Sequence, residues 1–168
     1  MPTTMKLIAK NVLGSNTATV TFSSIPQTYT DLLLITSARC SRAVTVSDLA
    51  VAFNGSTANF TGRALYGNGS SALSTTSVAR YVGTITGANA TANTFGSSEC
   101  YIPNYTGSTN KSFSVSGCNE TNATEAYISV IAGLWSNTAA ITSIDITEQG
   151  GGNLVTGSSF FLYGITKA

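Results

Sequence analysis

Apolar and polar residues alternate along short segments of this chain, and this period of two dominates the sequence. In residues 17–23, Ala18, Val20 and Phe22 alternate with threonines and a serine. Such a period is typical of a strand with one buried and one solvated face. The same pattern returns at residues 49–53, 113–115 and 144–146. The sequence therefore predicts a chain built mostly of strands.

Clusters of glycine, asparagine, serine and proline separate these segments, and such clusters favour turns. The fold class we expect is all-β: a single jelly-roll-like antiparallel β-sandwich of about eight to ten strands. At this length we expect residues 1–168 to form one β-sandwich domain. The expected strands cover residues 5–10, 18–23, 31–38, 48–53, 63–66, 78–86, 95–102, 111–116, 127–135, 141–147 and 159–165.

Two of these segments, residues 32–35 and 160–165, are apolar on both faces. Strands of this kind belong in the middle of a sheet, with something covering the outer face. We therefore expect Phe161, Tyr163 and Ile165 to form a partner interface. Either a second subunit or the chain's own segment around residues 7–8 could supply the cover, and a second subunit is favoured.

Charged residues are scarce, at 9% of the chain with a net charge of +1, against about a quarter in average soluble proteins. Without a clustered basic face, no nucleic-acid partner is expected. A weakly charged surface suits a protein that packs against neighbours, although simple compositional bias explains it equally well. The apolar runs are far shorter than the ~20 residues of a membrane span, and the first residues do not resemble a signal peptide, so no membrane partner is expected.

The chain has no histidine, which removes the commonest general base and the usual zinc ligand. Catalysis would have to rest on carboxylates, none of which form a recognisable pair. We expect no enzyme activity, no catalytic or metal-binding residue, no cofactor and no small-molecule ligand. The carboxylates are Asp31, Asp48, Glu99, Glu120, Glu125, Asp145 and Glu148.

The three cysteines, Cys40, Cys100 and Cys118, have no metal or redox spacing, so buried free thiols are expected. A hairpin around residues 107–110 would permit a bond between Cys100 and Cys118 without requiring one.

Exposed aromatic rings on a β-sandwich can stack on sugar rings, which gives an alternative function of glycan binding. The candidate contacts are Tyr66, Tyr101, Tyr105 and Trp135. However, Trp135 ends the apolar run 128–134, where a place in the core is the commoner role.

Several stretches are similar to a known group of proteins. Residues 20–32 (VTFSSIPQTYTDL), 53–56 (FNGS), 102–106 (IPNYT), 133–144 (GLWSNTAAITSI) and 157–165 (GSSFFLYGI) resemble small virion structural proteins of tailed bacteriophages that infect cyanobacteria and other aquatic bacteria. The similarity extends over nearly the whole chain, but its motifs are strand and turn signatures that carry no catalytic residue.

The resemblance implies a capsid decoration, or cement, protein with a jelly-roll-like sandwich. Its partners would be the major capsid protein and copies of itself, with a trimer expected, and it would lie on the capsid surface of a virion assembled in the host cytoplasm. The glycine- and asparagine-rich tips at Asn68 and Gly151 would add contacts to the capsid. The resemblance leaves open a tail-associated or receptor-binding module that recognises host surface glycan.

Overall fold

A computed structural model describes residues 4–122 and 125–166, which form twelve strands and no helix. The all-β prediction is confirmed, and the strand number exceeds the expected eight to ten. The strands are β1 (Met5–Val12), β2 (Thr19–Phe22), β3 (Asp31–Ala38), β4 (Val46–Phe53), β5 (Phe60–Gly67), β6 (Ala72–Thr75), β7 (Tyr81–Thr86), β8 (Gly96–Ile102), β9 (Lys111–Glu120), β10 (Ala126–Trp135), β11 (Ile144–Glu148) and β12 (Ser159–Ile165).

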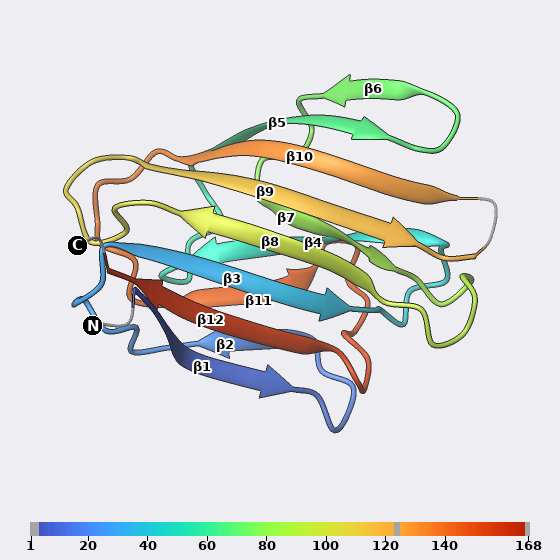
Figure 1. Ribbon diagram of the computed structural model, residues 1–168, viewed down its shortest axis with the longest axis horizontal. Helices are drawn as coiled ribbons and strands as arrows, with labels where there is room; N and C mark the ends of the chain where they lie inside the picture. The colour runs from blue at the N-terminus through green and yellow to red at the C-terminus, as the bar shows by residue number, and fades with distance from the viewer. Residues whose placement is uncertain (1–3, 123–124, 167–168) are drawn as a thin grey trace.

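The strands form two antiparallel sheets that face each other (Figure 1). The larger sheet has eight strands in the order β1-β12-β3-β8-β9-β10-β5-β6, and the smaller has four in the order β2-β11-β4-β7. The edge strand β7 contacts β8, β9 and β10 of the larger sheet. The smaller sheet therefore covers one part of the larger sheet, while β5 and β6 extend beyond it.

Along much of the chain, consecutive strands lie in different sheets. This holds for the pairs β1 and β2, β3 and β4, β7 and β8, and β11 and β12. A jelly-roll-like winding requires this alternation, although the jelly-roll assignment itself stays a prediction. The remaining four strands, β5, β6, β9 and β10, all join the larger sheet beyond β8. Of these four, β9 and β10 still contact β7, whereas β5 and β6 extend past the smaller sheet.

The sequence of β9 shows why these segments become strands. Its residues alternate without exception between buried and exposed. Phe113 and Val115 point into the core, while Ser114 and Ser116 point outward. One face of each such strand thus contributes apolar area to a shared core, at about 25 cal/mol per Å² removed from water.

The two segments that are apolar on both faces lie inside the larger sheet and not at its edges, although β12 is next to the edge strand β1. β12 lies between β1 and β3, and β3 lies between β12 and β8. β1 pairs alongside β12, with Leu7 opposite Tyr163. The N-terminal segment therefore widens the sheet instead of covering its outer face, and that alternative for the cover is wrong.

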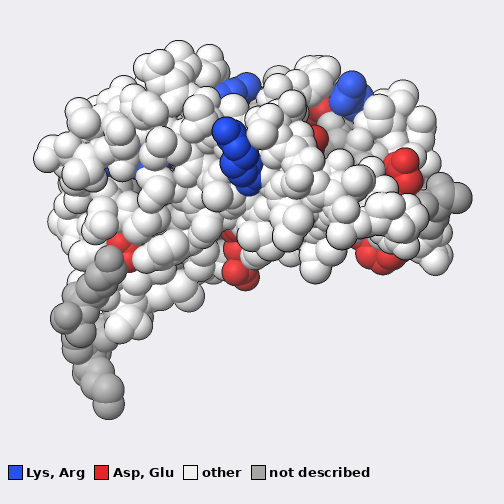
Figure 2. Space-filling view, turned by 90° about the horizontal axis from the view of Figure 1, so that it is seen from above, with Lys and Arg blue, Asp and Glu red and all other residues white. Residues whose placement is uncertain are grey.

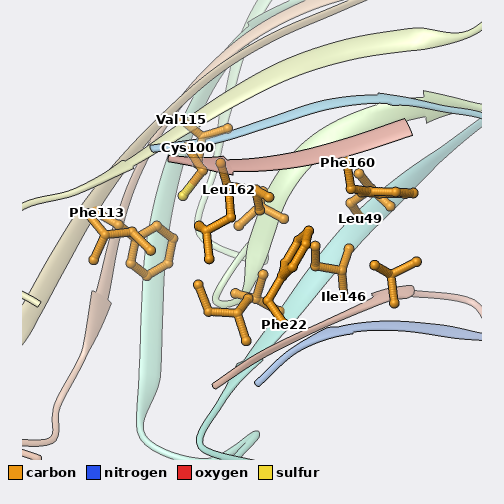
Figure 3. Close-up of a cluster of buried hydrophobic side chains, with 14 of the residues drawn as sticks. Phe22, Leu49, Cys100, Phe113, Val115, Ile146, Phe160 and Leu162 are labelled. Atoms are coloured by element: carbon orange, nitrogen blue, oxygen red, sulfur yellow. The ribbon is translucent and has the colours of Figure 1, made fainter. Parts of the chain in front are cut away.

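The core lies between the two sheets, where Phe22 and Ile146 of the smaller sheet meet Phe160 and Leu162 of the larger (Figure 3). At one end, Trp135 packs against Phe53 with ring centroids 5.5 Å apart. Trp135 is 1% exposed, which confirms its predicted place in the core.

A buried lysine closes the same end of the core. Lys111 is 1% exposed, and its Nζ donates hydrogen bonds to the carbonyl oxygens of Gly107 at 2.6 Å, Thr109 at 2.5 Å and Thr138 at 3.4 Å. Three carbonyls replace the water that the ammonium group loses, since a buried charge without such partners would be very costly. Burial lowers the pKa of Lys111. The ammonium group fixes the turn between β8 and β9.

Some strand boundaries differ from those predicted. The segment expected at 141–147 begins only at Ile144, and the one expected at 78–86 begins at Tyr81. β6 was not predicted at all, because Ala72, Leu73 and Ser74 are exposed and show no clear alternation. This strand depends on its pairing with β5.

Candidate functional sites: an outer sheet face and a cleft

The outer face of the eight-stranded sheet carries a cluster of exposed apolar side chains where β10 pairs with β5. Val130 lies opposite Leu65, and Ile128 is the next outward-facing residue along β10. Their exposed fractions are 58%, 63% and 66% respectively. Such side chains rarely gather on the surface of a monomer unless something binds there. Sequence analysis did not single out these three residues, although β10 has apolar residues on both of its faces.

The rest of this face is small and weakly charged. Alternate residues of β9 from Ser112 to Cys118 form a row of small side chains beside β10. Beyond β8, Leu33 of β3 lies opposite Tyr163 of β12, and both are half-buried. The face thus has two apolar ends, and between them lie this row of small side chains and Glu99 and Tyr101 of β8.

The predicted interface residues fall in two places. Phe161, Tyr163 and Ile165 alternate with buried residues along β12 and lie half-buried on the outer face. Asn68 lies in the turn between β5 and β6, and Gly151 lies in the turn that follows β11. Both turns leave the sandwich at the end opposite to the marked chain termini (Figure 1). The two groups could therefore contact different partners.

A cleft of about 440 Å³ opens on the other face of the larger sheet, beside the smaller sheet. β4 and β7 line one side of the cleft, and β5 and β10 line the other, where the larger sheet continues past the edge strand β7. The size is at the low end of the range for small-molecule sites. The lining residues are Val46, Asp48, Ala64, Tyr66, Thr75, Ser77, Val78, Tyr81, Thr84, Glu125, Tyr127, Ser129 and Ile131.

Three tyrosines give the cleft its aromatic character. Tyr66 of β5 and Tyr127 of β10 are stacked, with centroids 6.0 Å apart and planes 27° apart, and Tyr81 lies on the opposite wall. Two hydroxyl groups in the wall, those of Thr84 and Ser129, are buried and have no hydrogen-bond partner in the described part of the chain. Buried polar groups in native structures are nearly always paired.

The cleft is acidic. Burial raises the pKa of Asp48 to about 6, and the nearby Glu148 carboxylate adds to the increase while Arg42 opposes it. Burial also raises the pKa of Tyr127, and the nearby Glu125 carboxylate raises it further. Asp48 and Glu125 thus bring two acidic groups to one cleft, a pairing that sequence analysis did not find.

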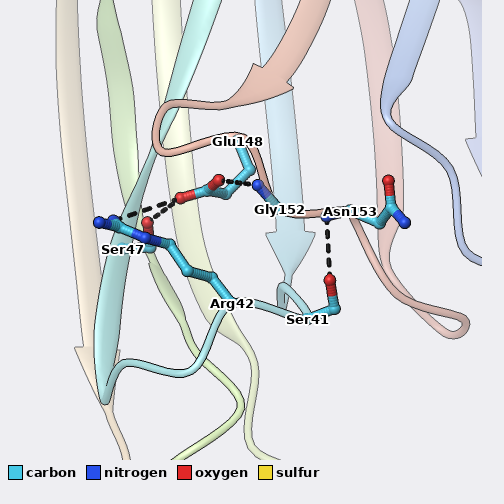
Figure 4. A network of polar contacts seen from close by, with 6 residues as sticks. All are labelled: Ser41, Arg42, Ser47, Glu148, Gly152 and Asn153. Carbon is cyan, nitrogen blue, oxygen red and sulfur yellow. Dashed lines mark hydrogen bonds and ion pairs between the residues drawn. The ribbon is translucent and has the colours of Figure 1, made fainter.

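Glu148 belongs to a polar network next to this cleft (Figure 4). Its buried carboxylate accepts hydrogen bonds from the Ser47 hydroxyl and from the Gly152 backbone N–H, and Arg42 lies 3.7 Å away. Burial favours a higher pKa, but these hydrogen bonds and the guanidinium outweigh it and hold the pKa of Glu148 below its usual value. The network fixes the loop after β11 against β4.

Charged side chains do not gather elsewhere on the visible surface. In Figure 2 the charged residues are scattered among uncharged ones. Among the described residues, no group of three or more His, Cys, Asp or Glu side chains could hold a metal ion.

The four candidate glycan contacts do not come together. Tyr66 lines the cleft, whereas Tyr101 lies on the outer face, where its hydroxyl donates a 2.6 Å hydrogen bond to Asp31. Tyr105 and Trp135 are buried at 0% and 1% exposure, so neither ring can present a face to a ligand. The cleft residues Tyr81 and Tyr127 were not predicted.

The cysteines are free, and only two of the three are buried. Cys100 points into the core from β8, whereas Cys118 points outward from β9, opposite Ser97. The expectation that all three are buried is therefore wrong for Cys118. Facing opposite sides of the sheet, Cys100 and Cys118 do not form the bond that sequence analysis left open.

No family model, no curated protein and no solved structure matches this chain. In the described ranges, no helix has the length and apolar character needed to cross a membrane. The resemblance to phage virion proteins therefore stays a prediction.

Proposed function

We propose that this chain is a non-enzymatic structural protein that self-assembles through the outer face of its eight-stranded sheet and decorates a phage capsid. The observation that carries the proposal is the exposed apolar cluster of Leu65, Ile128 and Val130 on that face. The resemblance described above supplies the capsid as the setting, with the loop tips at Asn68 and Gly151 contacting the major capsid protein.

The size and charge of the outer face support a second copy of this chain as its cover. Eight strands about 4.8 Å apart, each about seven residues long at about 3.3 Å per residue, give an area of roughly 800 Å². A stable interface buries about that much on each partner. Because the face is weakly charged, two copies would not repel each other.

Sedimentation velocity of the full chain at micromolar concentration tests this assembly. We expect an oligomer, with the trimer as the predicted size, and we expect Val130→Lys or Leu65→Lys to shift it towards the monomer. Leu73→Lys is the matched control, because Leu73 is also exposed, at 39%, but lies opposite Tyr66 on the other face. A wild-type monomer that also fails to bind empty capsids lacking the protein would contradict the proposal.

The non-enzymatic part is tested separately, because Asp48 and Glu125 line one cleft and paired carboxylates are the groups that glycosidases use. We expect no release of reducing sugar from host polysaccharide. Turnover that Asp48→Asn abolishes would overturn this part of the proposal.

A further inference from the structure

The cleft between β4 and β7 on one side and β5 and β10 on the other has features of a built binding site. It combines a volume of about 440 Å³ with aromatic, hydroxyl and carboxylate groups on facing walls. Ser129 is only 4% exposed, yet its hydroxyl finds no partner in the described ranges, and neither does that of Thr84. A concave site with a few convergent polar groups is the usual form of a small-molecule site.

The arrangement of the tyrosines narrows the class of ligand. The planes of Tyr66 and Tyr127 are only 27° apart and their centroids 6.0 Å apart, so the two rings stack on each other and do not surround a ligand from several sides. A cage for a quaternary ammonium ion places aromatic faces around the cation. The outer face of such a stacked pair instead suits a flat apolar surface, such as the C–H face of a sugar ring, with hydroxyl groups free at its edge.

The charges of the cleft narrow the class further. Asp48 and Glu125 line it, and no described Lys or Arg does. A phosphate, sulfate, uronate or sialate would meet two carboxylates with no cation in the lining, because Arg42 and Arg80 act on Asp48 and Tyr81 only from outside it, and like charges repel strongly where water is partly excluded. Sugar hydroxyls, in contrast, can donate to carboxylates and to the Ser and Thr oxygens.

We propose that this cleft binds a neutral pyranose sugar, as a terminal residue or a disaccharide, with its ring against the outer face of the stacked Tyr66–Tyr127 pair and its hydroxyls bonded to Asp48 and Glu125. The proposal departs from the sequence-based expectation of no small-molecule ligand. It is independent of self-assembly, because the cleft and the cluster of Leu65, Ile128 and Val130 lie on opposite faces of the sheet.

The test is a titration of the ¹⁵N-labelled full chain followed by NMR. The probes are methyl glucoside, methyl galactoside, N-acetylglucosamine, lactose and cellobiose, with glucuronate and choline chloride as the anionic and cationic alternatives. We expect at least one neutral sugar to shift amide signals of residues 64–66, 81–84 and 127–131 and to saturate in the millimolar range. Signals on β1 and β12 should not move.

Variants then assign the binding to the stacked tyrosine pair. Tyr127→Ala should weaken the affinity about tenfold or more, whereas Tyr127→Phe, which keeps the ring, should change it by less than about threefold. Tyr163→Ala removes a tyrosine from the outer face and should leave the affinity unchanged. Because loss of a ring could also disturb folding, Ser77→Trp provides a second test: Ser77 is an exposed residue of the cleft, and the larger side chain should block the cleft without removing core area.

Three results would overturn the proposal. The first is that no neutral sugar shifts the cleft signals at tens of millimolar. The second is that choline or glucuronate shifts them at lower concentration than every neutral sugar. The third is that a sugar binds but its affinity is unchanged in Ser77→Trp. None of these results would bear on the assembly proposal, which the outer-face variants test.

Discussion

Replacing Asp48 by asparagine should stabilise this protein at neutral pH. The carboxyl group is partly buried between β4 and β7, and burial together with the Glu148 carboxylate raises its pKa from 3.8 to about 6. The native state therefore holds its proton more tightly than the unfolded chain does. Between about pH 4 and pH 6 the unfolded state loses that proton first, so the free energy of unfolding falls as the pH rises.

The magnitude follows from the difference between the two pKa values. Each pKa unit corresponds to about 1.4 kcal/mol, so an increase from 3.8 to about 6 makes the ionised Asp48 cost up to about 3 kcal/mol above pH 7. Asparagine has nearly the same size and carries no charge. At pH 7.5, Asp48→Asn should therefore have a free energy of unfolding about 2–3 kcal/mol larger than that of wild type, and so unfold at a higher urea concentration. This difference should vanish near pH 4.

Urea denaturation at fixed protein concentration, repeated from pH 4 to pH 8, measures this difference directly. Glu125→Gln is the control, because Glu125 is an exposed acid away from the outer face, where removal of one charge should change stability little at any pH. The reasoning is refuted if Asp48→Asn is no more stable than wild type at pH 7.5, or if its advantage grows as the pH falls.

Three further predictions concern the core and the thiols. Trp135→Ala should cost ~3–5 kcal/mol of stability by calorimetry, as removal of a buried aromatic side chain does, and an unchanged melting temperature would place the ring outside the core. Lys111→Met should cost about 1–3 kcal/mol in urea unfolding, because three carbonyl groups lose their donor, and a neutral result would show that they find other partners. In the folded Val130→Lys variant, whose outer face would not be covered by another copy, maleimide should modify Cys118 but not the buried Cys40 and Cys100, as mass spectrometry would reveal; modification of all three at one rate would contradict the topology.

The fold class could be predicted from the sequence because side-chain alternation is a local property. In β9 the period of two persists through ten residues, and the two segments apolar on both faces, β3 and β12, do lie inside the sheet and not at its edges. β6 could not be predicted this way, because a short exposed strand at a sheet edge buries almost nothing and leaves no pattern. Its existence depends on pairing with β5.

The cleft could not be predicted for a related reason. Tyr66 and Tyr127 are far apart in the sequence and become neighbours only because β10 pairs with β5. Asp48 faces them only because the larger sheet extends beyond β7. Alternation shows which face of a strand is buried, but it does not show the order of strands in a sheet, so it does not show which residues from different strands meet.

The exposed cluster on the outer face is an intermediate case. Ile128 and Val130 point outward from β10, whereas Ile131, on the opposite face of the same strand, points into the core. The pattern reveals that β10 has two apolar faces. It does not show which of them is covered within the chain and which is left for a partner.

Locating the chain in a particle by cryo-electron microscopy tests the central claim most directly. The account predicts density for this β-sandwich on the outer surface of the capsid, with the face that carries Leu65, Ile128 and Val130 buried against another copy and the tips at Asn68 and Gly151 towards the major capsid protein. Density in the tail, or copies on the capsid whose outer sheet faces lie open to solvent, would contradict it.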